Sequence, residues 1–225
     1  MRDELDHQLE GLLGQVVDMG RRADEMLARA LQALHAGDLA AADAVTTSDR
    51  VLDRAYDQVQ HGVVATIALH APVGRDLRLA TGVLHVALHT ERMADYAVGV
   101  ARTTLRAAEH EPDRDLLEQL IEMGELARGV GRDAMTAFVQ ADADLARAAA
   151  RQDDAVDRLN VGIFQRLVRL AAHSEERLRW ATRMIQLTRQ LERYADHGVD
   201  ISEQAMFVAT GQHTELSADA VSDRE

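Results

Sequence analysis

Acidic residues four positions apart recur at four places in this sequence. Glu192 and Asp196 lie within QLERYADHGVDISE, and Glu91 and Asp95 lie within TERMADYAVGVAR. On a helix, residues four apart share one face, and like charges there repel by a few tenths of a kcal/mol when exposed. Their recurrence favours a shared purpose over four chance arrangements. The pairs are Asp49/Asp53, Glu91/Asp95, Asp153/Asp157 and Glu192/Asp196.

Carboxylates grouped in this way are suited to binding metal ions. An all-oxygen donor set favours magnesium, calcium, manganese or iron, with zinc also possible. Asp200 follows Asp196 by another four residues and is a further candidate ligand, whereas its counterpart in the first half is Gly99, which supplies none. We therefore predict two carboxylate metal sites, the second richer in ligands than the first.

Two other interpretations of the acids stay open. They could lie on solvated helix faces without a metal, as single pairs at this spacing commonly do. They could instead pair with arginines, and Arg189 and Arg193 lie three residues before Glu192 and Asp196. Any of these carboxylates that is buried needs a partner, since burying an unpaired charge is costly.

Histidines are weaker metal-ligand candidates. His85 and His89 are four apart, a spacing that suits zinc, but they lie about 120° and 160° around a helix from Glu91. We therefore expect surface or interface histidines that do not share the carboxylate site. The single Glu-x-x-His motif, Glu4 to His7, lies in a terminal segment, and ferritin-like bundles need two on core helices. No P-loop, dinucleotide fingerprint or nucleophile–base motif predicts an active site.

Helical periodicity runs through nearly the whole sequence, broken only at short polar or Gly- and Pro-containing segments. Long helices joined by such short breaks must fold back antiparallel and bundle through their apolar faces. Hydrophobic residues make up 47% of the chain and aromatic residues 3%, which favours an all-α protein. The six predicted helices span roughly 5–35, 38–69, 75–107, 113–140, 143–172 and 175–209.

The second half of the chain repeats the first. Met19-Gly20 recurs as Met123-Gly124, 104 residues later, and the motif Glu-Arg-x-Ala-Asp at 91–95 recurs at 192–196, 101 residues later. We therefore predict two tandem three-helix bundles related by an internal repeat. The predicted units are a first bundle at 1–110, a second at 111–210, and a polar, flexible tail at 211–225.

The repeat places the acid pairs on two helices of each bundle, on either side of a turn. Asp53 and Glu91 are equidistant from Pro72, and Asp157 and Glu192 are equidistant from the turn at 174–175. In an antiparallel hairpin, such residues lie at about the same height. Each bundle can therefore bring four carboxylates together across two helices.

Composition excludes several functional classes. The formal charge of −13 argues against a surface for nucleic acid or anionic membranes. The chain has no cysteine, which excludes disulfides, thiolate catalysis and iron–sulfur clusters. The N-terminal sequence lacks signal-peptide features, and no apolar run nears the roughly 18 residues that would cross a bilayer. We expect a soluble, cytoplasmic protein without nucleic-acid partners or direct membrane insertion.

Two tandem units that each contain an ER-x-x-D helix, ERMAD at 91–95 and ERYAD at 192–196, resemble the PhoU family. APVGRDLRLATGVL at 71–84 is similar to the family's Pro-x-x-x-Asp-Leu-Arg helix start. The resemblance covers about residues 3–210 and implies acidic motifs that hold iron or zinc clusters. Gly99 departs from the family's Asn or Asp at that position, which weakens the first cluster. The implied ligands are Asp49, Asp53, Glu91, Asp95, Asp153, Asp157, Glu192, Asp196 and Asp200.

The resemblance also implies a non-enzymatic, often dimeric regulator that represses phosphate-starvation genes when phosphate is plentiful. Its implied partners are the ATPase of a phosphate ABC transporter and a sensor histidine kinase, and a homodimer is expected. Two alternatives stay open. A carboxylate-bridged di-metal oxidase would need histidine ligands, which the sequence does not place beside the acids. A metal-free helical scaffold would need none.

Overall fold

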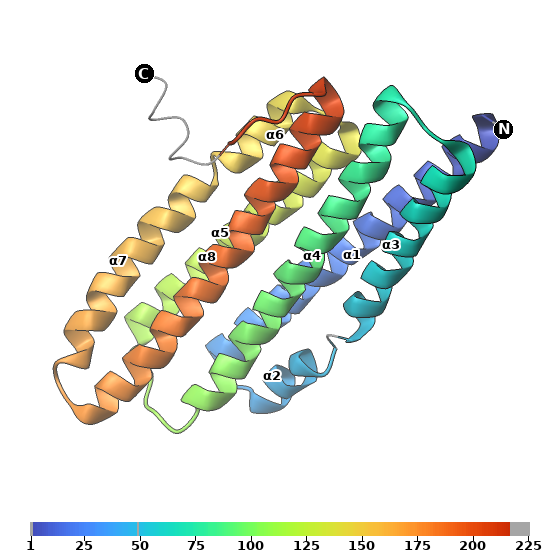
Figure 1. Ribbon diagram of the computed structural model, residues 1–225. Helices are drawn as coiled ribbons and strands as arrows, with labels where there is room; N and C mark the ends of the chain where they lie inside the picture. Colours follow the sequence, from blue (N-terminus) through green and yellow to red (C-terminus); the bar gives the residue numbers. More distant parts are fainter. Residues whose placement is uncertain (1, 49, 217–225) are drawn as a thin grey trace, which may run out of the picture.

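The computed structural model describes residues 2–48 and 50–216, and within them the only regular structure is α-helix (Figure 1). One unit comprises α1, α2, α3 and α4, and the other comprises α5, α6, α7 and α8. The all-α fold of two three-helix bundles is confirmed, with one helix of each bundle divided in two. The helices are α1 (Arg2–Ala36), α2 (Leu39–Thr46), α3 (Arg50–His70), α4 (Gly74–Ala107), α5 (Arg114–Gln140), α6 (Ala143–Ala150), α7 (Asp153–Ala171) and α8 (Glu175–Thr210).

Side-chain caps and glycine set several helix boundaries. The Asp113 carboxylate accepts a hydrogen bond from the Leu116 amide at the start of α5, and the Ser174 hydroxyl accepts one from the Arg177 amide at the start of α8. Each satisfies an amide that has no partner within its own helix. α8 ends at Gly211, whose φ of 78° is a left-handed conformation that glycine adopts without strain.

The helix predicted over 38–69 is interrupted in the structure, where it forms α2 and α3. The hydroxyls of Thr46, Thr47 and Ser48 each donate to the carbonyl three residues earlier, at 2.8, 3.0 and 2.7 Å. Such side-chain bonds offer the backbone carbonyls an alternative to the regular helix ladder. Three hydroxyl residues in succession therefore end α2 before α3 begins.

The helix predicted over 143–172 is interrupted at the equivalent place. The backbone N–H of Gln152 donates to the Ala149 carbonyl at 3.0 Å. The side-chain amide of Gln152 donates to Asp133 of α5 at 2.6 Å. The chain then restarts as α7 at Asp153. The break thus places Asp153, one of the predicted ligands, in the first turn of a helix.

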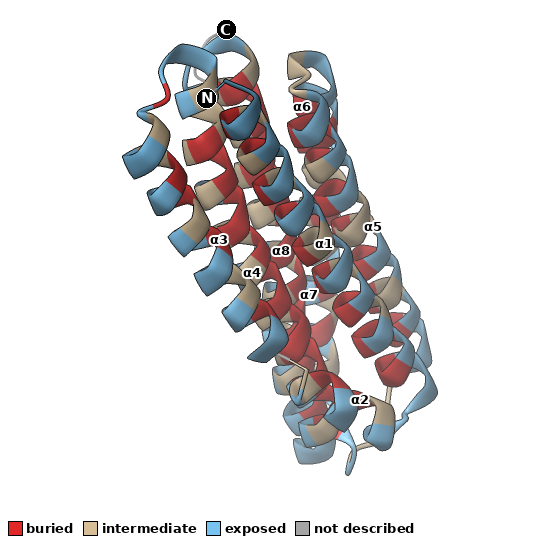
Figure 2. Ribbon diagram, turned by 90° about the vertical axis from the view of Figure 1, so that its right-hand side faces the viewer, coloured by how far each residue is buried: buried red, intermediate tan, exposed pale blue. Residues whose placement is uncertain are grey.

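The two bundles pack against each other through α4 with α8 and α1 with α5. α4 and α8 run side by side at the centre, while α3 and α7 lie at opposite outer edges (Figure 1). Buried residues face inward along every long helix (Figure 2). No helix in the described ranges is long and apolar enough to cross a membrane.

Contacts between α1 and α5 come in equivalent pairs. A Cβ added to Gly20 would lie 2.7 Å from the Met135 side chain, and one added to Gly124 would lie 2.5 Å from the Leu31 side chain. Gly124 and Met135 stand 104 positions after Gly20 and Leu31. The same contact is therefore made twice with the roles of the two halves exchanged, which is the signature of an approximate internal two-fold axis.

A largely buried ion pair lies in this same contact between the bundles. Arg128 of α5 donates to both carboxylate oxygens of Asp24 of α1, at 2.8 and 2.9 Å. The two side chains are 14% and 17% exposed. A two-pronged contact of this kind fixes the relative orientation of the helices that carry it.

The C-terminal tail was predicted to be flexible, and it is described as far as Leu216. The Leu216 amide donates to Glu203 of α8 at 2.9 Å, and the His213 ring stacks on Phe207 with ring centres 4.1 Å apart. This short segment therefore runs back along α8. The rest of the predicted tail, 217–225, lies outside the described residues.

Candidate metal centre

The four predicted ligands of the second bundle gather between two packed helices. Asp153 and Asp157 lie at the start of α7, and Glu192 and Asp196 lie in the middle of α8. All four are partly buried. α7 and α8 are joined by the turn at 172–174, so the acids face one another at matching heights from it.

The carboxylates are close enough to raise one another's pKa values. Burial raises the pKa of Asp153 to about 7, and the neighbouring Asp157 and Asp196 carboxylates add to the rise. The pKa of Asp196 is likewise raised to about 6, chiefly by burial and then by Glu192, while Arg193 acts to lower it. In addition, Oδ1 of Asp153 is buried without a hydrogen-bond partner. A cation would relieve both the repulsion and the unsatisfied oxygen. Among the described residues, however, the only three potential ligand atoms within 4.8 Å of one another belong to His89, His197 and Asp200, so these four carboxylates are spread more widely than a single ion requires.

The predicted ligands of the first bundle are arranged less favourably. Asp53 of α3 is exposed, whereas Glu91 and Asp95 of α4 are partly buried. Arg92 lies 3.4 Å from Asp95 Oδ2 and 3.5 Å from Glu91 Oε2. The fourth predicted ligand, Asp49, lies outside the described residues. The acids of α4 are therefore already approached by a cationic side chain.

Arginines lie beside the acids in both bundles and not in the second alone. The sequence supported arginine pairing only in the second bundle, where Arg193 does lie 3.4 Å from Asp196. The contact between Arg92 and Asp95 has the same length and the same three-residue spacing. Each arginine is more than half exposed, so neither contact seals its carboxylate from solvent.

Asp200 lines one hollow together with Asp153 and Asp196, and it also contacts two histidines. It adjoins the second carboxylate group, since its charge raises the pKa of Asp196. Its Oδ2, however, lies 2.9 Å from Nδ1 of His197 on α8 and 3.2 Å from Nδ1 of His89 on α4. Burial acts to raise the pKa of Asp200, but hydrogen bonds from His197 and His89 and their charges outweigh it and lower the pKa.

The expectation that no histidine lies beside the acids is wrong. His89 is an interface histidine, as predicted, and it meets His197 and Asp200 across the contact between α4 and α8. No sequence motif marks His197, although it stands three residues before Asp200 and so shares its helix face. His85, the other predicted histidine, is exposed.

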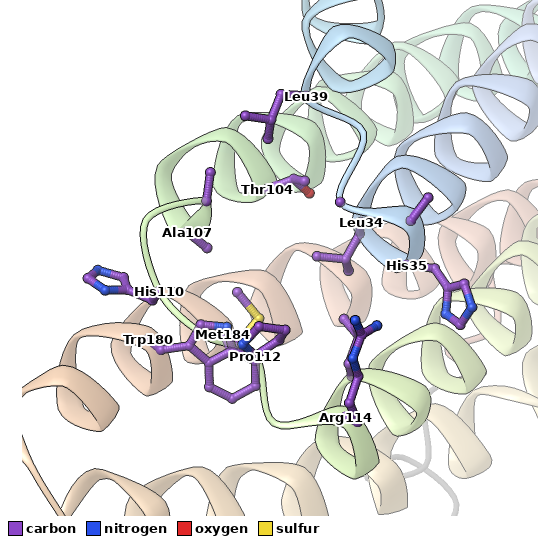
Figure 3. A pocket seen from close by; sticks show the side chains of 14 residues that line it. Leu34, His35, Leu39, Thr104, Ala107, His110, Pro112, Arg114, Trp180 and Met184 are labelled. Carbon is purple, nitrogen blue, oxygen red and sulfur yellow. The ribbon is translucent and has the colours of Figure 1, made fainter.

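A separate hollow of about 270 Å³ lies where α1 and α4 end and α5 begins. Trp180 and Met184 of α8 line it together with Leu34, Pro112 and Arg114 (Figure 3). None of the residues that line it is acidic. The hollow therefore offers no carboxylate ligands and is separate from the candidate metal centre.

Comparisons with known proteins match both halves of the chain. The family model for the PhoU domain matches residues 16–104 and 120–205. A phosphate-specific transport system accessory protein PhoU homolog from Clostridium acetobutylicum is 24% identical over 217 residues, covering 96% of this chain and 99% of that protein. A homolog of the same name from Rhizobium meliloti is 27% identical over 206 residues, covering 92% and 87%.

Solved structures show the same architecture. The crystal structure of the phosphate transport system regulatory protein PhoU from Streptococcus pneumoniae superposes with a TM-score of 0.86 at 24% identity, covering 93% of this chain and 99% of that one. The structure of PhoU from Pseudomonas aeruginosa gives a TM-score of 0.82 at 26% identity, covering 92% and 99%. The match includes both bundles in each case.

Proposed function

Because the chain belongs to the PhoU family, we propose that it is an accessory and regulatory protein of a phosphate-specific transport system. The supporting observation is the extent of the match. The family model matches both bundles, and relatives of that name align over nearly their whole length. The chain therefore carries both halves of the architecture on which those relatives are built.

In this proposal the protein acts by contact and not by catalysis. It is a cytoplasmic adaptor, active as a homodimer, between the ATPase of the phosphate ABC transporter and a sensor histidine kinase. It represses phosphate-starvation genes when phosphate is plentiful. A formal charge of −13 disfavours direct DNA binding, which supports an action through protein partners.

A gene deletion tests the regulatory role. In phosphate-rich medium, the deletion strain should express phosphate-starvation genes such as a secreted phosphatase, and a plasmid copy should restore repression. Unchanged repression in a strain without a second homolog would contradict the proposal. Co-purification from cells expressing tagged ATPase or kinase then tests the adaptor role, because retention of neither partner argues against it.

The carboxylate group of the second bundle is proposed to hold a metal ion. Asp153, Asp157, Glu192 and Asp196 would supply oxygen ligands to iron, zinc, magnesium or manganese. The bound cation would supply the positive charge that keeps these acids ionised and ties α7 to α8. The first bundle, with an exposed Asp53 and with Arg92 beside its acids, would bind more weakly.

Elemental analysis after gentle purification tests this metal site. Wild type should retain metal, and Asp153→Asn should retain less. Asp144→Asn is the matched control, because Asp144 is 91% exposed on the neighbouring helix α6. Metal-free wild type that melts at the same temperature with and without added cations would favour the metal-free scaffold instead. Oxygen consumption by metal-loaded protein with a reductant would favour the di-metal oxidase.

A further inference from the structure

Three potential metal ligands converge where the two bundles meet. Nδ1 of His89 lies 3.1 Å from Nδ1 of His197 and 3.2 Å from Oδ2 of Asp200. The third side of the triangle, from His197 Nδ1 to Asp200 Oδ2, measures 2.9 Å. The two histidine side chains are 18% and 20% exposed, so they are held within the interface and not on the open surface.

The three atoms can be held together by hydrogen bonds or by a cation, depending on which imidazole nitrogens carry hydrogen. Each neutral imidazole carries one N–H and one bare nitrogen. If both Nδ1 atoms of His89 and His197 carry hydrogen, they donate to one shared oxygen of Asp200 while lying 3.1 Å from each other. If one Nδ1 is bare, its lone pair faces a carboxylate oxygen. When both Nδ1 atoms are bare, three lone pairs converge on one point, and a cation placed there would be bound by all three.

The dimensions of the triangle suit tetrahedral coordination. Ligand bonds of about 2.0–2.1 Å place neighbouring corners of a tetrahedron about 3.3 Å apart. The three observed separations, 2.9, 3.1 and 3.2 Å, are close to that edge. We propose that His89, His197 and Asp200 form a binding site for a single zinc-class transition metal ion, which links the first bundle to the second.

The donor set separates this site from the carboxylate group beside it. Two imidazole nitrogens and one carboxylate oxygen suit zinc and neighbouring transition metals, whereas magnesium and calcium prefer oxygen alone. Three protein ligands leave a fourth position, and Asp200 is 40% exposed, so solvent can supply that ligand. The Tyr96 ring stacks on His197 at 5.6 Å and limits the rotation of the imidazole.

The internal repeat shows that packing does not require these residues. Gln190 and Gly99 stand at the positions equivalent to His89 and Asp200, 101 residues away in each case. They too meet across α4 and α8, because a Cβ on Gly99 would lie 2.5 Å from the Gln190 side chain. The contact between α4 and α8 therefore occurs twice, once with Gln190 against Gly99 and once with three potential metal ligands.

Zinc binding to the full-length protein tests this site. Chelator-treated protein is titrated with Zn²⁺ against a chromogenic chelator, with excess Mg²⁺ present to occupy the all-oxygen sites. His89→Gln and His197→Gln should each lose one equivalent of zinc, or bind it at least about tenfold more weakly. Gln190→Ala, at the equivalent position of the repeat, is the matched control and should bind as wild type does.

Co²⁺ supplies a second readout that needs no variant. In wild type it should develop the visible absorption of a tetrahedral ion, and Zn²⁺ should abolish that absorption by displacement. Metal-free melting curves establish that the histidine variants fold. Equal zinc affinity in wild type and both histidine variants, or no tetrahedral Co²⁺ spectrum in wild type, would overturn the proposal. Neither outcome bears on the regulatory role, which the deletion strain tests separately.

Discussion

Replacing Asp153 by asparagine should stabilise the metal-free protein at neutral pH. Burial beside other acids raises the pKa of Asp153 from its ordinary 3.8 to about 7 in the folded protein. Between these values the folded state holds a proton that the unfolded state has released. The contribution of the Asp153 carboxyl to the free energy of unfolding is therefore fully present below about pH 4, and it is lost as the pH rises through about 7.

The size of the effect follows from the pKa shift. A rise from 3.8 to about 7 corresponds to about 4 kcal/mol if all of it were realised in stability. Asp153 is only partly buried, and solvent screens the repulsion from Asp157 and Asp196. We therefore expect Asp153→Asn, which removes the charge at nearly constant shape, to raise the free energy of unfolding by about 2 kcal/mol at pH 8.

Denaturant unfolding in the presence of a chelator provides the measurement. The gain in Asp153→Asn should be about 2 kcal/mol at pH 8, smaller at pH 5, and close to zero below about pH 4, where the wild-type carboxyl is protonated in both the folded and the unfolded state. Asp53→Asn is the control, because Asp53 is exposed and should show little change at any of these pH values. A destabilised or pH-independent Asp153→Asn would refute the reasoning.

Metal should reverse the sign of the same substitution. A bound cation favours the ionised carboxylate, so wild type gains stability by mass action that Asp153→Asn cannot match. In saturating metal, the variant should therefore be the less stable of the two proteins. If the variant stays more stable at every metal concentration, Asp153 is not a ligand.

Two further predictions concern the packing of the helices. Arg128→Ala should lower the free energy of unfolding by about 3 kcal/mol, because it leaves Asp24 largely buried without its bidentate partner. In denaturant unfolding, Asp24→Ala should cost less in the Arg128→Ala background than in wild type. Strict additivity of the two substitutions would contradict the pairing. Gly198→Ala should lower the melting temperature, since its Cβ would lie 3.1 Å from the Gly131 backbone nitrogen, whereas Gly162→Ala, with nothing within 4 Å, should gain about 0.5–1 kcal/mol in helix propensity. Equal shifts for the two glycine variants would show that α5 and α8 are not in close contact there.

Much of the architecture was accessible from the sequence because it depends on periodicity and on an internal repeat. Equal spacing of Asp157 and Glu192 about one turn predicts that they lie near the same height, since a hairpin converts sequence distance into position along the helix. Both carboxylates raise the pKa of Asp153, so they do lie near that residue. The divided helices were missed for a local reason. Hydroxyls that bond back to carbonyls, as at Ser48, do not disturb the apolar pattern from which the helix was predicted.

The histidine cluster was not accessible in the same way. His89 and His197 are 108 residues apart and belong to different bundles, so their meeting depends on how α4 crosses α8. That crossing is set by close contacts such as Gln190 against Gly99, which are invisible until the helices are in place. The position of Gly99 was interpreted only as a missing ligand, although it also makes room for a neighbouring helix.

The approximate two-fold axis relates two sides of the interface between the bundles, and these two sides can differ in sequence. The bundles meet as two copies of one protein would meet in a dimer, where every substitution appears on both sides and any cluster comes in pairs. Because they are joined in one chain, the two sides can diverge. Gln190 and Gly99 keep one crossing as simple packing, while His89 and Asp200 give the other a chemistry of its own, once per chain.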